Sequence, residues 1–221
     1  MAERSYPQRD YSRPAEAVEI MLVRHGASQA AVEGQPFELL EGQADPPLSP
    51  EGLAQAKAVA TFLADKSMEA LFITPLCRTA QTAQAIAEAT GLEPVVIAEL
   101  REVHLGELDG GAFRIALHAG DPVVQEVFAQ ERWDVIPGAE PMEDLAERAR
   151  AGIERIVASV PAGATVAAIV HGGIIGELCH QATASKRFAF THADNCSITR
   201  LIVFPDGRWW LRSFNEGGHL G

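Results

Sequence analysis

The chain has 221 residues, of which 47% are hydrophobic and 22% are charged, a composition typical of a globular protein. The 30 acidic residues outnumber the 18 basic ones and give a formal net charge of -12. This charge would repel a nucleic-acid backbone, and a phosphate site would have to be built locally from a few converging arginines. The apolar runs are shorter than the roughly 18 residues that a membrane-spanning helix needs. We therefore expect no nucleic-acid partner and no membrane association.

The length fits one large α/β domain better than two small ones. Residues 1–16 are mostly polar and contain two prolines, so we expect a flexible N-terminal arm at 1–16 and a single domain at 17–221. The cysteines, Cys77, Cys179 and Cys196, are an odd number without metal-ligand spacing. This pattern indicates reduced thiols in a cytoplasmic protein, and no metal site.

The first half of the domain alternates short apolar runs with helical segments. Ser49 and Pro50 supply an N-cap hydroxyl and a proline at the first helical position. Gly91 is a typical residue at a helix C-terminus. The sequence predicts, in order, a strand at 18–23, a helix at 49–65, a strand at 70–73, a helix at 76–90 and a strand at 94–97.

The second half continues this alternation. The middle segment, 110–137, mixes helical spacing with Gly120 and Pro122, and we expect one or two helices packed over the sheet. Later elements are predicted as a helix at 141–159, a strand at 165–170, a helix at 172–182 and a hairpin of strands at 198–204 and 209–213. Strands that alternate with helices indicate an α/β fold of three layers, with a mainly parallel sheet flanked by helices on both faces.

Two arginines and two histidines follow the predicted strands. Arg24 and His25 come after the first strand, Arg78 after the second and His171 after the strand at 165–170. Ligands in open α/β sheets bind beyond the carboxyl ends of the strands, so these side chains should lie together. Each alone has a structural explanation, as a surface cation or a hydrogen-bonded histidine. Together they would repel one another unless an anion lies between them, and phosphate suits arginine best.

The triplet Arg24-His25-Gly26 resembles the signature of the histidine phosphatase superfamily, which includes the phosphoglycerate mutases. The resemblance runs from about 18 to 212 and implies a phosphoglycerate mutase-like fold. Further similar blocks follow in the family's order: a loop and helix at 43–56, an arginine block at 75–82, an acid block at 100–110, a histidine block at 171–173 and a late strand at 195–198.

The resemblance also implies a mechanism. His25 would attack phosphorus and form a phosphohistidine, because a neutral imidazole is a good nucleophile. Arg24, Arg78 and a protonated His171 would neutralise the phosphoryl oxygens. Glu102 would protonate the leaving oxygen and then activate water, a role for which Glu99 and Glu107 are weaker candidates. No metal and no cofactor are implied.

Four residues are expected to bind the substrate. Backbone amides near Gly26 and Gly172, at helix starts, would help to hold the phosphoryl group. Ser28 and Gln43 match the family's loop positions. Where the family often has an acid and, further on, an asparagine that touches the substrate, this chain has Ala27 and Ala31. Ala31 cannot offer an amide, and the segment at 32–41 is longer than usual.

Two further residues have open interpretations. Glu140 precedes a predicted helix and would either face the pocket or cap that helix. Trp133 lies in the variable middle segment, where packing is the ordinary role of a tryptophan and lining the leaving-group pocket is the alternative. We place His104, His118, His180 and His192 outside the site because no motif matches them.

The expected function is hydrolysis of small phosphomonoesters by a phosphatase, with a small phosphorylated molecule as substrate. A mutase that returns the phosphoryl group to a sugar acid is the first alternative, although Arg101-Glu102-Val103 and the modest middle segment favour hydrolysis. An inactive phospholigand-binding module is the second. A dinucleotide oxidoreductase would rest on 171–176, which lacks the first glycine of the fingerprint. The sequence names no particular substrate and leaves a homodimer open.

Overall fold

A computed structural model describes residues 6–8 and 10–221. Its main sheet has six strands in the order β5-β4-β6-β1-β7-β8. The four strands from β5 to β1 are parallel, and β7 and β8 extend the sheet antiparallel. The predicted mainly parallel sheet is therefore confirmed. The strands are β1 (Val18–Arg24), β4 (Ala70–Ile73), β5 (Pro94–Val96), β6 (Thr165–Val170), β7 (Ile198–Val203) and β8 (Trp209–Glu216).

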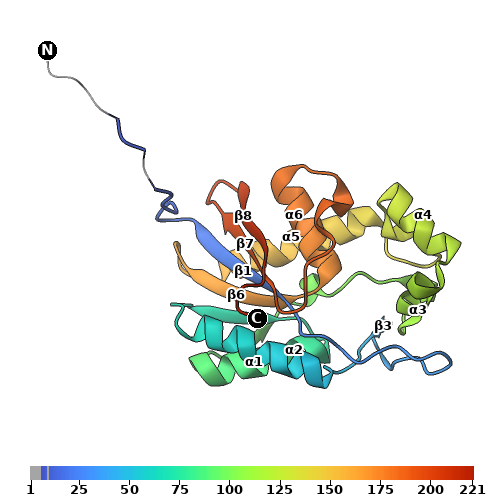
Figure 1. The fold of residues 1–221 in the computed structure, drawn as a ribbon. Helices are drawn as coiled ribbons and strands as arrows, with labels where there is room; N and C mark the ends of the chain where they lie inside the picture. The colour runs from blue at the N-terminus through green and yellow to red at the C-terminus, as the bar shows by residue number, and fades with distance from the viewer. Residues whose placement is uncertain (1–5, 9) are drawn as a thin grey trace, which may run out of the picture.

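Helices cover both faces of this sheet (Figure 1). One face carries α1 (Pro50–Ala64) and α2 (Cys77–Thr90), and the other carries α5 (Met142–Ala158) and α6 (Gly172–Thr183). Successive side chains of β1 enter different layers: Ile20 and Leu22 pack in the core with α5 and α6, while Met21 and Val23 pack with α1 and α2. A strand with both faces buried has to be apolar throughout, which explains the apolar runs in the sequence.

The predicted helix ends are present. Ser49 Oγ accepts a hydrogen bond from the Gly52 amide at 3.1 Å and caps α1. Gly91 ends α2 with a φ of 74°, a left-handed conformation that glycine adopts without strain. α2 begins at Cys77, four residues after β4 ends at Ile73, so Arg78 lies in its first turn at the carboxyl end of the sheet.

The middle segment forms α3 (Ala112–Ala119) and α4 (Pro122–Gln130). We expected helices packed over the sheet, but Figure 1 shows them beyond its carboxyl end. α3 has no fully buried residue, and α4 buries only Val124 and Val127. Apolar side chains of these helices, Phe113, Leu117 and Phe128, line a pocket instead of covering a sheet face.

Several short elements were not predicted. The long segment after His25 leads into a small two-stranded sheet of β2 (Leu39–Leu40) and β3 (Gln43–Ala44). Strands of two residues leave no periodic signal. The 3-10 helices are η1 (Ala98–Leu100), η2 (Gly106–Leu108), η3 (Trp133–Val135) and η4 (Arg187–Phe190).

The predicted arm falls partly on residues 1–5 and 9, which lie outside the described residues. Within its described part, Arg13 donates to the carbonyl oxygen of Gly163 at 2.7 Å and to Thr165 Oγ1 at 2.9 Å. These contacts join part of the predicted arm to the domain, and residues 1–5 and 9 are not described. The boundary between arm and domain stays a prediction. All three cysteines are free thiols. No helix in the described residues is both long and apolar enough to span a membrane.

Candidate active site

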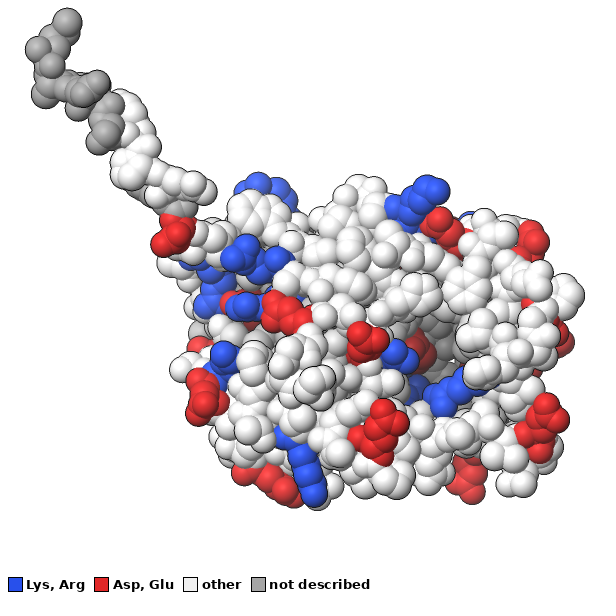
Figure 2. Space-filling model, viewed as in Figure 1, with Lys and Arg blue, Asp and Glu red and all other residues white. Residues whose placement is uncertain are grey.

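A pocket of about 450 Å³ lies beyond the carboxyl ends of β1, β4 and β6. Figure 2 shows a hollow between the body of the molecule and the part formed by α3 and α4, with basic and acidic side chains around it. Arg24, His25, Arg78, Glu102 and Gly172 all line this pocket. The strand-end residues of the sequence therefore meet in one place.

His25 is held in a single orientation. Its Nδ1 lies 2.7 Å from the Gly26 carbonyl oxygen, which can only accept, so Nδ1 carries the proton. Nε2 then has the lone pair, and it accepts a 3.3 Å hydrogen bond from Nε of Arg78. Burial, followed by the charges of Arg78 and Arg24, lowers the pKa of His25 well below its usual value of 6.5. A neutral imidazole with Nε2 facing a cationic pocket can act as a nucleophile.

Gly26 makes backbone contacts with α2 and with the start of α1. Its amide donates to Thr82 Oγ1 at 3.0 Å, and it does not lie at a helix start. Binding of phosphate near Gly26 stays a prediction. A Cβ at position 26 would lie 2.5 Å from the Gly52 carbonyl oxygen. A glycine is therefore required where the loop after β1 passes against the start of α1.

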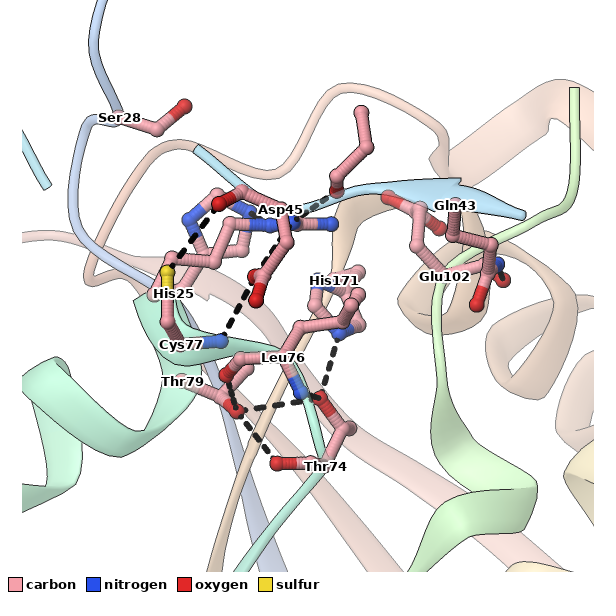
Figure 3. Close-up of polar contacts among 12 residues, drawn as sticks. His25, Ser28, Gln43, Asp45, Thr74, Leu76, Cys77, Thr79, Glu102 and His171 are labelled. Carbon is pink, nitrogen blue, oxygen red and sulfur yellow. Dashed lines mark hydrogen bonds and ion pairs between the residues drawn. The ribbon is translucent and has the colours of Figure 1, made fainter. Parts of the chain in front are cut away.

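His171 lies beside the first histidine, with 5.2 Å between the ring centroids. Its Nε2 is 2.9 Å from Thr74 Oγ1 (Figure 3), and its buried Nδ1 has no hydrogen-bond partner among the described residues. Burial, followed by the charges of Arg78 and His25, lowers the pKa of His171 well below 6.5. Burial and these charges therefore disfavour the expected protonated form of the ring. A phosphoryl dianion would restore it by supplying the opposite charge.

Arg24 and Arg78 are fixed by backbone carbonyl groups. Arg24 donates to the Ala193 oxygen at 2.5 Å, and its buried Nε has no partner among the described residues. Arg78 donates to the Ala44 oxygen at 2.8 Å and lies 3.8 Å from the carboxylate of Asp45. Carbonyl groups orient these guanidinium groups without neutralising them, so much of their charge stays available to an anion.

Glu102 stands across the pocket from His25, with His171 between them in the view of Figure 3. Its two oxygens accept from the amides of Val103 at 3.0 Å and Gly173 at 3.3 Å, at the first turn of α6. Within the acid block at 100–110, Asp109 also lines the pocket. Its oxygens are occupied by the amides of Ala44 and Leu105. Both carboxylates accept from amides, but among carboxylates Glu102 acts most strongly on Arg24 and Arg78: burial lowers the pKa of both arginines, and the charge of Glu102 is the largest cause that raises it. This favours Glu102 as the group that exchanges a proton with a ligand.

The alternatives to Glu102 lie elsewhere. Glu99 pairs with Arg155 at 2.9 Å, and Glu107 is exposed; neither lines the pocket. Glu140 neither faces the pocket nor caps α5. It accepts from the amide of His104 and forms a two-bond ion pair with Arg148.

Sequence reasoning missed Arg148. This residue of α5 donates to the carbonyl oxygens of Glu99, Arg101 and Glu102 at 2.7–2.9 Å. Gln43 also donates to the carbonyl oxygen of Glu102. These contacts fix the backbone on which the Glu102 carboxylate is mounted. Nothing in the local sequence around Arg148 distinguishes it from the other arginines of an amphipathic helix.

Of the other residues expected to bind the substrate, two line the pocket and one does not. Gly172 and Gln43 line the pocket, although the amide nitrogen of Gln43 is occupied by Glu102. Ser28 is not part of the lining, and its Oγ accepts instead from Arg114 of α3 at 2.7 Å. Substrate binding by Gly172, Gln43 and Ser28 stays a prediction.

The wall beyond the histidines is largely apolar. It includes Trp133, in agreement with the second interpretation of that residue, and it also includes His192, which we had placed outside the site. The apolar lining consists of Phe37, Pro46, Val103, Leu105, Leu108, Phe113, Leu117, Phe128 and Trp133. Most of these side chains come from the segments whose sequence was least informative.

Within residues 6–8 and 10–221, no group of three or more His, Cys, Asp or Glu side chains is arranged to hold a metal ion. The pocket is lined by three arginines, by His25 and His192, and by the carboxylates of Glu102, Asp109 and Asp194. That combination can bind a phosphoryl group, offer it a nucleophile and exchange a proton with it.

Comparison with known proteins assigns the class. A model of the histidine phosphatase superfamily (branch 1) matches residues 20–217. The chain belongs to this superfamily, as its sequence motifs predict. The expected phosphoglycerate mutase-like fold is likewise confirmed by solved structures.

The relatives include both mutases and phosphatases. The probable phosphoglycerate mutase GpmB of Photorhabdus laumondii is 30% identical over 189 residues, which cover 83% of this chain and 84% of that protein. A mycobacterial glucosyl-3-phosphoglycerate phosphatase has a TM-score of 0.76 at 27% identity, over 91% of this chain and all of that one. A phosphoglycerate mutase from Bacillus anthracis shares the fold, with a TM-score of 0.76 at 24% identity over 93% and 96% of the two chains.

The geometry at His25 makes a prediction for the free protein. Because burial and nearby guanidinium groups disfavour the imidazolium, the ring should stay a neutral Nδ1–H tautomer well below pH 6.5. Proton–nitrogen NMR correlations of the ring, recorded from about pH 7 to about pH 5, measure this directly. In Arg78→Gln the loss of a cation should raise the pKa of His25. A ring that titrates near 6.5 in the unmodified protein would contradict the assignment.

Proposed function

We propose that this chain is a phosphatase that hydrolyses small phosphomonoesters through a phosphohistidine at Nε2 of His25. The observation that carries the proposal is the fixed tautomer of His25, whose basic nitrogen faces a pocket with Arg24 and Arg78. The buried Nδ1 of His171, which has no hydrogen-bond partner among the described residues, supplies a further polar atom beside it.

The first half of the reaction transfers the phosphoryl group. Nε2 of His25 forms a bond to phosphorus while the ester bond to the leaving oxygen breaks. Protonated Glu102 gives its proton to that oxygen, so the product leaves as a neutral alcohol. Arg24, Arg78 and His171 balance the charge on the phosphoryl oxygens throughout.

In the second half of the reaction Glu102 accepts a proton instead of donating one. The Glu102 carboxylate takes a proton from water as the water oxygen bonds to phosphorus, and the bond to His25 breaks. Inorganic phosphate leaves, and both side chains return to their starting forms. All the groups required belong to the chain, and we propose that no metal ion takes part.

The apolar lining of the pocket favours hydrolysis over a mutase reaction, in which the phosphoryl group returns to the sugar acid. Trp133 and Phe113 pack edge to face with centroids 5.8 Å apart, and both line the pocket together with Phe37 and Phe128. Aromatic walls bind the carbon skeleton of a leaving group, but they offer few hydrogen bonds to retain a small sugar acid for a second transfer. The probable mutase at 30% identity keeps a mutase as the second candidate.

A product analysis separates the candidate functions. We expect release of inorganic phosphate from a panel of alkyl and aryl phosphates, without interconversion of 3- and 2-phosphoglycerate. EDTA should leave the rate unchanged, and vanadate, which mimics five-coordinate phosphorus, should inhibit.

Each contrary result of that analysis has a distinct meaning. Isomerisation of phosphoglycerate faster than phosphate release would make the protein a mutase. Activity lost in EDTA and restored by magnesium would contradict the metal-free chemistry. Phosphate binding without turnover of any ester would identify a binding module.

The role of Glu102 makes a separate prediction. Glu102→Gln should slow single-turnover reactions of alkyl phosphates on the order of 100-fold, because their leaving oxygen needs a proton. The loss with p-nitrophenyl phosphate should be much smaller, since its phenolate leaves unaided. Glu107→Gln is the matched control, because Glu107 is exposed and lies outside the pocket. Equal small losses with both esters would assign the acid elsewhere.

A further inference from the structure

One cation of the pocket comes from outside all of the motifs. Arg114, on α3, lines the pocket from its exposed side. Its NH2 donates to Ser28 Oγ at 2.7 Å and its NH1 donates to the Gln29 carbonyl oxygen at 2.9 Å. Among the described residues no carboxylate pairs with it. Two partners leave about three of the five guanidinium N–H groups for another ligand.

Small residues allow α3 to reach this position. Gly111 precedes the helix with a φ of 98°, and a Cβ there would lie 2.9 Å from the ring of Phe37 and 3.2 Å from Cβ of Ala31. A larger side chain at position 31 or 111 would push the start of α3 away from the loop after His25. Ala31 therefore brings Arg114 into the pocket while offering no polar group itself.

The charge of Arg114 acts on the groups that would handle the phosphoryl group. After burial, the charges of Arg78 and Arg24 are the largest causes that lower the pKa of Arg114. The charge of Arg114 also contributes to the lowered pKa of His25, after burial and the other two arginines. Three guanidinium groups that repel one another around a nucleophile form a site for a multiply charged anion.

We propose that Arg114 is a third guanidinium ligand of the phosphoryl group, supplied by α3 in place of the polar side chain that Ala31 lacks. Ser28 and Gln29 orient it, and its free N–H groups bind a phosphoryl oxygen on the side away from Arg24 and Arg78. Its position at the exposed side of the pocket would couple phosphoryl binding to the placement of α3. This inference rests on the proposed phosphoryl site.

Binding of inorganic phosphate tests the inference without a leaving group. Isothermal titration should show phosphate binding about tenfold weaker to Arg114→Gln than to the unmodified protein, as expected for loss of a charge-assisted hydrogen bond. Arg114→Lys, which keeps the charge but not the planar fork, should lie between the two. Arg208→Gln is the control for net charge, because Arg208 is exposed and pairs with Asp206 in the distant hairpin turn. Thermal unfolding checks that each variant is folded.

The outcomes separate this inference from the proposed function. Unchanged phosphate affinity in folded Arg114→Gln would overturn the role of Arg114, as would a loss of activity confined to esters whose leaving group carries a carboxylate. Phosphate binding that weakens as expected in a protein that hydrolyses no ester would leave the inference standing and overturn the phosphatase. Absence of phosphate binding to the unmodified protein would overturn both.

Discussion

The hydrogen bond from Nδ1 of His25 to the Gly26 carbonyl oxygen decides which ring nitrogen faces the pocket. The loop after β1 lies close to α1, where Gly26 and Gly52 leave room for two backbones to touch. The side-chain amide of Asn195 donates to the His25 carbonyl oxygen at 2.8 Å and fixes the backbone of the same residue. The chemistry of the pocket therefore depends on backbone packing as much as on the imidazole itself.

The second constraint is charge. A chain with a net charge of -12 repels phosphate at long range, so the attraction has to come from nearby groups. Arg24 and Arg78 are held mainly by carbonyl oxygens, which orient a guanidinium group without cancelling its charge. Burial, followed by nearby positive charges that include Arg78 and Arg24, lowers the pKa of both histidines, so the neutral rings add no further cation to the site. A phosphoryl dianion reverses this balance, and we expect His171 to take up a proton as the anion binds.

The sequence predicts best what depends on residues close together in the chain. The apolar run of β1, the Ser49 cap and the Gly91 stop are local features, and all three appear as expected. Arg114 and Arg148 could not be predicted, because most of the groups they contact lie 46 or more positions away and their own helices look ordinary. The placement of α3 and α4 beyond the sheet follows from packing against the pocket, which periodicity does not encode. The lowered pKa of His171 could not be predicted either, since the burial that causes most of it arises only in the fold.

The most direct test of the account is to identify the phosphorylated atom during turnover. Protein quenched in alkali while hydrolysing a phosphomonoester should retain an acid-labile phosphoryl group, and mass spectrometry of its peptides should place that group on His25. Phosphorus NMR of the same sample should show a phosphoramidate with attachment at Nε2, the nitrogen left free by the bond from Nδ1 to Gly26. A phosphoryl group on His171 or on a carboxylate, or turnover without any phosphorylated protein in rapidly quenched samples, would contradict the account.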